Sequence, residues 1–100
     1  MSSPANVPLM RLCLDRAGSF LRASKLVAFT IAWGAASKEV PDLTVAGYAE
    51  YWGQNMRSAE REMKLFERTF PELSSPNELL AMMDDVAAAT SVDVSHTALA

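Results

Sequence analysis

The chain has 100 residues, of which 50% are hydrophobic and 21% are charged. This composition fits one folded domain and excludes a chain that is disordered throughout. The formal net charge is −3, but acidic and basic residues are unevenly distributed along the chain. Residues 1–43 carry five basic and three acidic groups, residues 44–70 carry four of each, and residues 71–100 carry five acids and no base. The first seventy residues are therefore slightly basic, and a basic surface there is compatible with an acidic mean charge.

The sequence lacks the residues of most catalytic and metal sites. Cys13 and His96 are the only cysteine and histidine, which excludes an intramolecular disulfide and leaves no Cys-His pair or soft-ligand set for zinc. The four glycines are scattered rather than gathered in a phosphate-binding loop. We therefore expect no enzyme, no cofactor and no metal.

Nothing in the sequence predicts membrane insertion or secretion. The opening residues MSSPANVP lack the basic and apolar regions of a signal peptide. The longest nearly apolar run, residues 26–36, is too short to cross a bilayer. The sequence therefore predicts a cytoplasmic, all-α domain of four to five helices over residues 1–90, followed by a flexible tail at 91–100.

Taken in chain order, residues 1–8 are predicted to form a flexible arm because they are rich in serine, proline and asparagine. Helical periodicity begins at Leu9, and Leu12, Cys13, Arg16 and Phe20 follow one face. Gly18 and Ser19 interrupt the periodicity, either as a kink or as a break between two helices.

Residues 19–39 have the composition of a buried helix. Phe20, Val27, Ile31 and Ala35 fall on one side, and Leu26, Phe29 and Trp33 fall on nearly the opposite side. A helix that is apolar on both sides is either the central helix of the domain or part of a dimer interface.

Two shorter helices follow. Pro41 ends the preceding helix, and Thr44 is a suitable N-cap for a helix over residues 45–52. Residues 53–55 form a predicted turn, and Asn55 can cap a helix from Met56 that Pro71 stops near Phe70. Of the aromatic residues in 45–52, Trp52 is expected in the core and Tyr48 and Tyr51 at the rim or on a phosphate.

The last predicted helix covers residues 76–90. Ser75 offers an N-cap, Pro76 the first helical position and Glu78 the third. Its apolar stripe comprises Leu79, Leu80, Met83, Val86 and Ala87, and Asp84 and Asp85 lie on the solvated side.

The helix over residues 56–70 has one apolar and one basic face. At about 100° per residue, one sector holds the residues Met56, Ala59, Met63, Phe66 and Phe70. The opposite sector holds a row of four cations: Arg57, Arg61, Lys64 and Arg68. Glu60, Glu62 and Glu67 flank this basic row, so it is either neutralised by them as a solvated face or available for an anionic partner.

The stretch from Thr44 to Arg61 resembles the helix-turn-helix DNA-binding regulators of bacteria and phages. That family has a small residue in its first helix, a glycine four residues later and an apolar residue six further on, which correspond here to Ala49, Gly53 and Ala59. The continuation through Phe66, Phe70 and Pro71 is similar to an actinobacterial variant of the motif, over residues 44–70. The chain departs from the family at Glu62, where the family has an apolar residue and where Met63 must serve instead.

This resemblance implies sequence-specific binding to double-stranded DNA by a small regulator or accessory factor located at the nucleoid. Arg57, Ser58 and Arg61 would contact base edges, with Gln54 and Asn55 at the turn. Lys64, Arg68 and Thr44 would meet phosphate, and Lys25 and Lys38 could extend that track.

Two further expectations concern partners. We expect a homodimer through Leu26, Phe29 and Trp33 or through the 76–90 helix, because a small domain cannot easily bury both apolar surfaces. The alternative function is a helical protein-interaction module that docks its basic row on an acidic partner.

Overall fold

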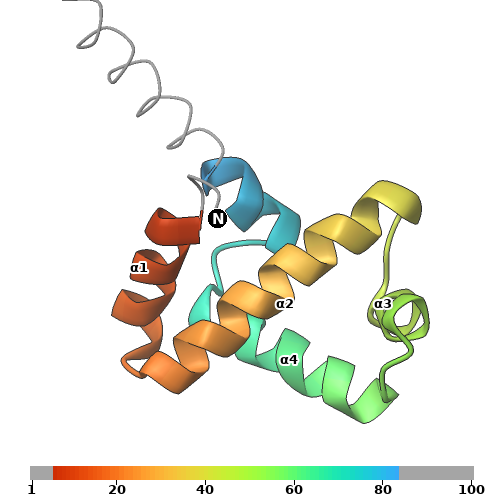
Figure 1. Cartoon of the computed structure of the whole chain (residues 1–100), viewed down its shortest axis with the longest axis horizontal. Coiled ribbons are helices and arrows are strands. Elements are labelled where there is room, and N and C mark those ends of the chain that lie inside the picture. Colours follow the sequence, from red (N-terminus) through yellow and green to blue (C-terminus); the bar gives the residue numbers. More distant parts are fainter. Residues whose placement is uncertain (1–5, 84–100) are drawn as a thin grey trace, which may run out of the picture.

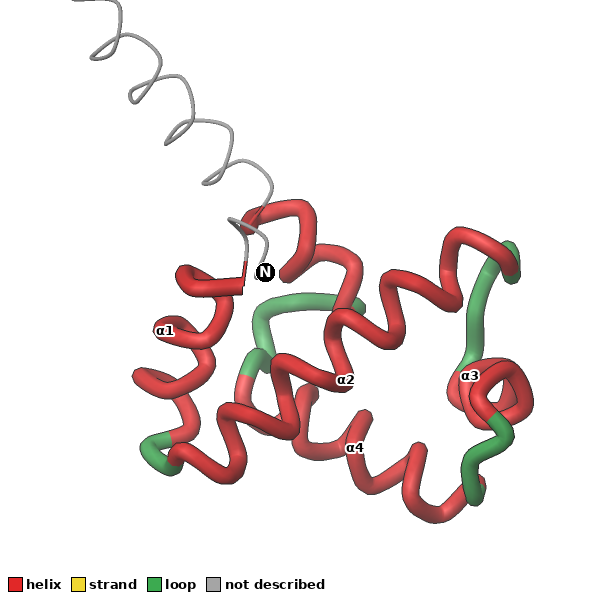
Figure 2. The backbone as a smooth tube through the Cα atoms, viewed as in Figure 1, coloured by secondary structure: helices red, strands yellow, loops and turns green. Residues whose placement is uncertain are grey.

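The fold is all-helical, as the sequence predicts. A computed structural model describes residues 6–83, which contain five helical segments and no strand (Figures 1 and 2). The helices are α1 (Asn6–Ala17), α2 (Phe20–Glu39), α3 (Val45–Trp52), α4 (Met56–Thr69) and a segment over residues 76–83. The predicted tail at 91–100, the second half of the 76–90 helix and His96 lie outside the described residues.

The first two helices form a hairpin that is broken at Gly18. This glycine has a positive φ of 68°, a backbone conformation that glycine adopts without steric cost. Ser19 then caps α2 by accepting a hydrogen bond from the backbone N–H of Arg22. Gly18 and Ser19 therefore separate two helices rather than kink one. Helix α1 also begins at Asn6, earlier than predicted, with Pro8 inside its first turn, where the absent N–H is tolerated.

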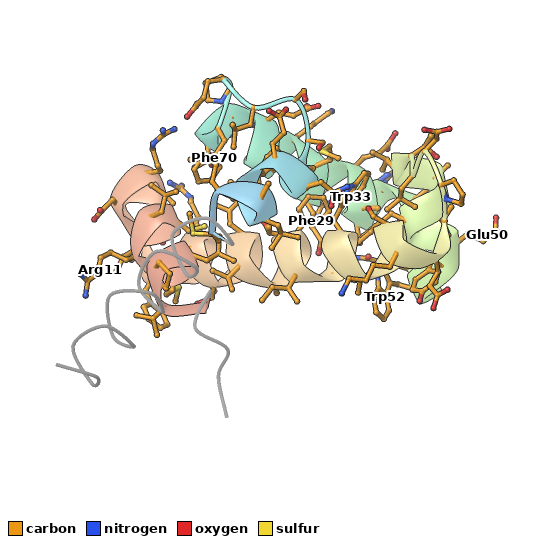
Figure 3. The ribbon with its side chains drawn as sticks, turned by 90° about the horizontal axis from the view of Figure 1, so that it is seen from above. Arg11, Phe29, Trp33, Glu50, Trp52 and Phe70 are labelled. Carbon is orange, nitrogen blue, oxygen red and sulfur yellow. The ribbon has the colours of Figure 1, made fainter. Side chains whose placement is uncertain are left out.

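Helix α2 is the central element of the fold, and its two apolar sides have different environments. Leu26, Phe29 and Trp33 are almost fully buried within the chain, and Figure 3 shows Phe29 and Trp33 between α2 and α4. They are therefore not available as the predicted dimer interface. On the outer side, the exposed fractions of Phe20 and Ile31 are 69% and 41%.

Local caps position α3 and α4 as the sequence predicts. The Thr44 hydroxyl accepts a hydrogen bond from the N–H of Gly47, 3.0 Å away, and the Asn55 side chain accepts one from the N–H of Arg57 at 2.8 Å. Between the two helices, Gly53 has φ 63° and ψ 35°, the left-handed conformation that closes α3. In Figure 1, α3 is seen end on while α4 lies across the view, so the chain changes direction sharply at this turn.

The segment over residues 76–83 packs against α2. Leu79 and Met83 are buried, and a methyl group built at Gly34 would overlap the Leu80 side chain, so the two helices approach closely at this glycine. The described part of the predicted 76–90 interface is therefore covered by the chain itself. At the start of the segment, the Glu78 carboxylate accepts hydrogen bonds from the N–H and hydroxyl of Ser74, one residue before the predicted cap Ser75.

The core contains an aromatic cluster, formed by Phe29, Trp33 and Tyr48, and a buried thiol. Tyr48 stacks on Trp33 with ring centroids 5.4 Å apart and meets Phe29 edge-on at 5.2 Å. Cys13 lies fully buried on α1, and burial raises the pKa of its thiol to about 11. Arg16 ties α1 to the end of α4 by donating to the carbonyl oxygen of Thr69 and to the Glu72 carboxylate.

The predictions that Trp52 and Met56 are buried, and that Tyr48 lies at the rim, are wrong. Tyr48 is 3% exposed and belongs to the aromatic cluster, whereas Trp52 is 47% exposed. Tyr48 fills the space between α2 and α3, so Trp52, at the last turn of α3, lies on the outer surface and donates its indole N–H to the carbonyl oxygen of Ala32. Met56, expected on the apolar face of α4, is 42% exposed because it occupies the first helical position.

Candidate nucleic-acid interface

The basic row lies on the exposed face of α4. Ala59, Phe66 and Phe70 are buried on the opposite side of this helix, so the predicted division between apolar and basic faces is confirmed. All four members of the row are exposed, namely Arg57, Arg61, Lys64 and Arg68. The row therefore faces away from the core.

The glutamates beside the basic row do not pair with it. Among residues 6–83, the one ion pair within 4.0 Å joins Arg16 of α1 to Glu72, which follows α4. Glu60 and Glu67 are exposed on the flank of α4 but form no ion pair with its cations in the part of the chain that the structure describes. Four like charges on one helix face, three or four residues apart, repel one another mildly. An anionic partner would relieve that repulsion.

A groove of about 430 Å³ runs between α2 and α4, and we call it the α2–α4 groove. The residues that line it are Arg22, Lys25, Leu26, Ser58, Arg61, Glu62, Lys64, Leu65 and Arg68. Five of these residues are cations and one is an acid. Figure 3 shows the N-terminal half of α2 running beside the C-terminal half of α4. The packing therefore adds two cations from α2 to three members of the basic row.

The single acid of the groove is already hydrogen-bonded. Glu62 is half-buried, and its carboxylate oxygens accept hydrogen bonds from the Tyr48 hydroxyl at 3.4 Å and from the Gln54 side-chain N–H at 3.2 Å. Burial, and then the nearby negative charge of Glu62, raise the pKa of Tyr48 to about 12. These contacts link α3 and the turn to α4 at the position where the helix-turn-helix family has an apolar residue. Met63, the next residue on α4, is half-buried and packs against the core.

The predicted site residues fall into two groups. Ser58, Arg61, Lys64 and Arg68 come together along the α2–α4 groove. Thr44, Gln54, Asn55 and Arg57 do not line it. Thr44 and Asn55 use their side-chain oxygens to cap helices, and Gln54 is bonded to Glu62. Arg57 is exposed on the same face of α4 as the other cations.

Nothing in the sequence pointed to Arg22, and Lys25 was predicted only as an extension of the phosphate track. Both lie on α2 at the border between its buried and exposed sides. Their spacing of three residues places them on one flank of the helix, but the neighbour that this flank faces depends on tertiary packing. Lys38, the other suggested extension, lies at the opposite end of α2 and does not line the groove.

Comparisons with known proteins give no assignment: no family model, curated protein or solved structure matches the chain. Within the described residues, no helix has the length and hydropathy needed to cross a membrane. The same residues hold no group of three or more side chains arranged to bind a metal ion.

Proposed function

We propose that the chain binds double-stranded DNA with α3 and α4 acting as a helix-turn-helix. The observation that carries the proposal is the basic row of α4. This row is exposed, has no ion pair among the described residues and lies on the helix that follows a left-handed glycine turn. In such proteins the second helix enters the major groove and its first turns approach the base edges.

The proposal assigns different roles along α4. Arg57, Ser58 and Arg61 lie in its first two turns, and an arginine can hold a guanine edge with two hydrogen bonds. Lys64 and Arg68 lie farther along the helix and contact phosphate, together with Thr44 at the start of α3. Gln54 and Asn55 lie close to the DNA at the turn, but their bonds to Glu62 and to the α4 backbone give them a positioning role as well.

A homodimer remains part of the proposal, but through a different surface from the one predicted. The outer residues of α2, Leu21, Ser24, Ala28, Ile31 and Ala35, alternate in spacing between three and four, which is the repeat of a helix–helix seam. In an antiparallel pair centred between residues 28 and 31, Ile31 of each copy faces Ala28 of the other. Two copies would then recognise two half-sites of one operator.

Selection of bound sequences from a pool of random duplexes tests DNA recognition. We expect enrichment of a motif, specific duplex that outcompetes random duplex, and an affinity that falls steeply as salt rises. A basic row that docks on an acidic protein, the alternative function, would give no enriched motif. Unchanged pool sequences after several rounds would therefore overturn the proposal.

Sedimentation at micromolar concentration tests the dimer separately. We expect a dimer for the wild-type chain and a monomer for Ile31→Glu, which places a charge on the outer side of α2. Glu39→Gln, at the end of the same helix, is the control and stays dimeric. A strict monomer that binds one operator tightly would contradict the dimer and leave DNA recognition standing.

A further inference from the structure

The α2–α4 groove has the charge and lining of a channel for a nucleic-acid backbone, and two of its cations come from outside the predicted motif. Arg22 and Lys25 belong to α2, whereas Arg61, Lys64 and Arg68 belong to α4. In the described part of the chain, none of the five forms an ion pair. Because Glu62 is held by Tyr48 and Gln54, the groove presents an excess of unpaired positive charge.

The floor of the groove is apolar. Leu26 is fully buried and Leu65 is half-buried beneath the cations. An apolar floor lowers the local dielectric constant, which strengthens the attraction between a cation and a phosphate. Leu65, which is half-buried, also offers part of its surface to the carbon atoms of a sugar. A strand with alternating sugars and phosphates matches this combination better than a free inorganic anion does.

The dimensions agree with a short piece of one strand. From residue 61 to residue 68, α4 rises by about 10 Å. One strand carries a phosphate about every 3.4 Å of rise along the duplex axis, and the distance along the strand itself is longer, so this stretch of α4 reaches at most about three phosphates. Arg68 at the end of this stretch and Arg22 on α2 can each hold phosphate oxygens with two hydrogen bonds.

We infer that the α2–α4 groove holds the sugar–phosphate backbone of one strand of the duplex, with Arg22 and Lys25 as phosphate contacts on the side opposite α4. This inference rests on the proposed function and extends it to α2. Contacts of this kind do not depend on the DNA sequence, because the phosphate group is the same at every base pair. It also gives α2 a role in orienting α4 on the duplex.

Single and double alanine variants at Arg22 and Lys25 provide the test, with Lys38→Ala as the matched control. Lys38 lies on the same helix and carries the same charge, but it is outside the groove. Each protein is titrated with a selected duplex and with a random duplex at several salt concentrations. Thermal unfolding of each variant checks that these exposed substitutions leave the fold intact.

We expect Arg22→Ala and Lys25→Ala to weaken both duplexes by the same factor and to reduce the slope of log affinity against log salt by about 0.9 each. Lys38→Ala leaves affinity and slope near those of the wild type. If the wild type binds duplex but the groove variants behave like Lys38→Ala, the inference fails and the proposed function stands. If the wild type binds no duplex, both fail. Loss of affinity for the selected duplex alone would indicate base contacts and would also overturn the inference.

Discussion

Tyr48 and Glu62 connect the first helix of the predicted motif to the second by a hydrogen bond of 3.4 Å between hydroxyl and carboxylate. The tyrosine ring is part of the aromatic cluster on α2, and Gln54 donates to the other oxygen of the same carboxylate. A single acidic side chain thus fixes α3, the turn and α4 relative to one another. In the helix-turn-helix family an apolar contact does this.

The burial of Tyr48 beside the negative charge of Glu62 predicts a loss of stability at alkaline pH. Because the pKa of Tyr48 is raised from 10 to about 12 in the folded chain, its stabilising effect is complete below pH 10 and is lost as the pH rises towards 12. At neutral pH, Tyr48→Phe should lower the free energy of unfolding by about 0.5–1.5 kcal/mol. Urea unfolding between pH 8 and 12 should show the difference between wild type and variant shrinking above pH 10. A difference that stays constant would contradict the assignment.

The two halves of the basic row should differ in what their removal does to DNA binding. Arg57→Ala and Arg61→Ala should each weaken the selected duplex by about 1–3 kcal/mol and relax sequence preference. Lys64→Ala and Arg68→Ala should weaken selected and random duplexes alike. Arg11→Ala, on the outside of α1 (Figure 3), is the control for removing one positive charge. Equal small losses at all four positions, matching that control, would favour a solvated face.

Asn55 separates a capping role from a recognition role. Its side chain accepts hydrogen bonds from the N–H groups of Arg57 and Ser58, so Asn55→Ala should lower the free energy of unfolding by about 0.5–2 kcal/mol. Asn55→Ser restores an N-cap oxygen and should recover most of that loss in thermal unfolding. If Asn55→Ser is stable but does not recognise the selected duplex, the amide also contacts a base.

The close approach of Gly34 to Leu80 predicts an energetic coupling between α2 and the 76–83 segment. In a helix interior, alanine is normally more favourable than glycine by about 1 kcal/mol. At residue 34, however, its methyl group would displace the Leu80 side chain. Gly34→Ala should therefore stabilise the chain more in a Leu80→Ala background than in the wild type, with a coupling of about 0.5–3 kcal/mol. A double-mutant cycle in urea measures it, and additive effects would show that the two helices do not meet there.

Local sequence signals predicted the helices well because caps and breakers act over a few residues. Thr44, Gly53 and Asn55 each have the conformation or bond expected of them. Which side of a helix faces the core was less predictable. Helix α2 is apolar on two sides, so periodicity alone could not show that Leu26 and Trp33 face the core while Ile31 faces outwards.

The burial of Tyr48 rather than Trp52 and the position of the α2 cations could not be predicted for the same physical reason, because both depend on tertiary packing. Tyr48 and Trp52 are one helical turn apart on α3, and which ring is covered depends on where α2 lies. Arg22 and Lys25 are more than thirty residues from α4 in sequence, so their meeting with Arg61 and Arg68 follows only from packing. The basic row itself lies on one helix, and that part of the candidate site was visible in the sequence.

The buried thiol of Cys13 can report local unfolding of the domain. It is buried and, with a pKa of about 11, mostly protonated at neutral pH, so a thiol reagent reacts only when the packing around α1 opens. The rate of thiol modification then measures how often this local opening occurs, and no label has to be introduced. Because α2 carries two of the groove cations, slower modification in the presence of duplex would show that a contact at the groove also stabilises the packing of α1.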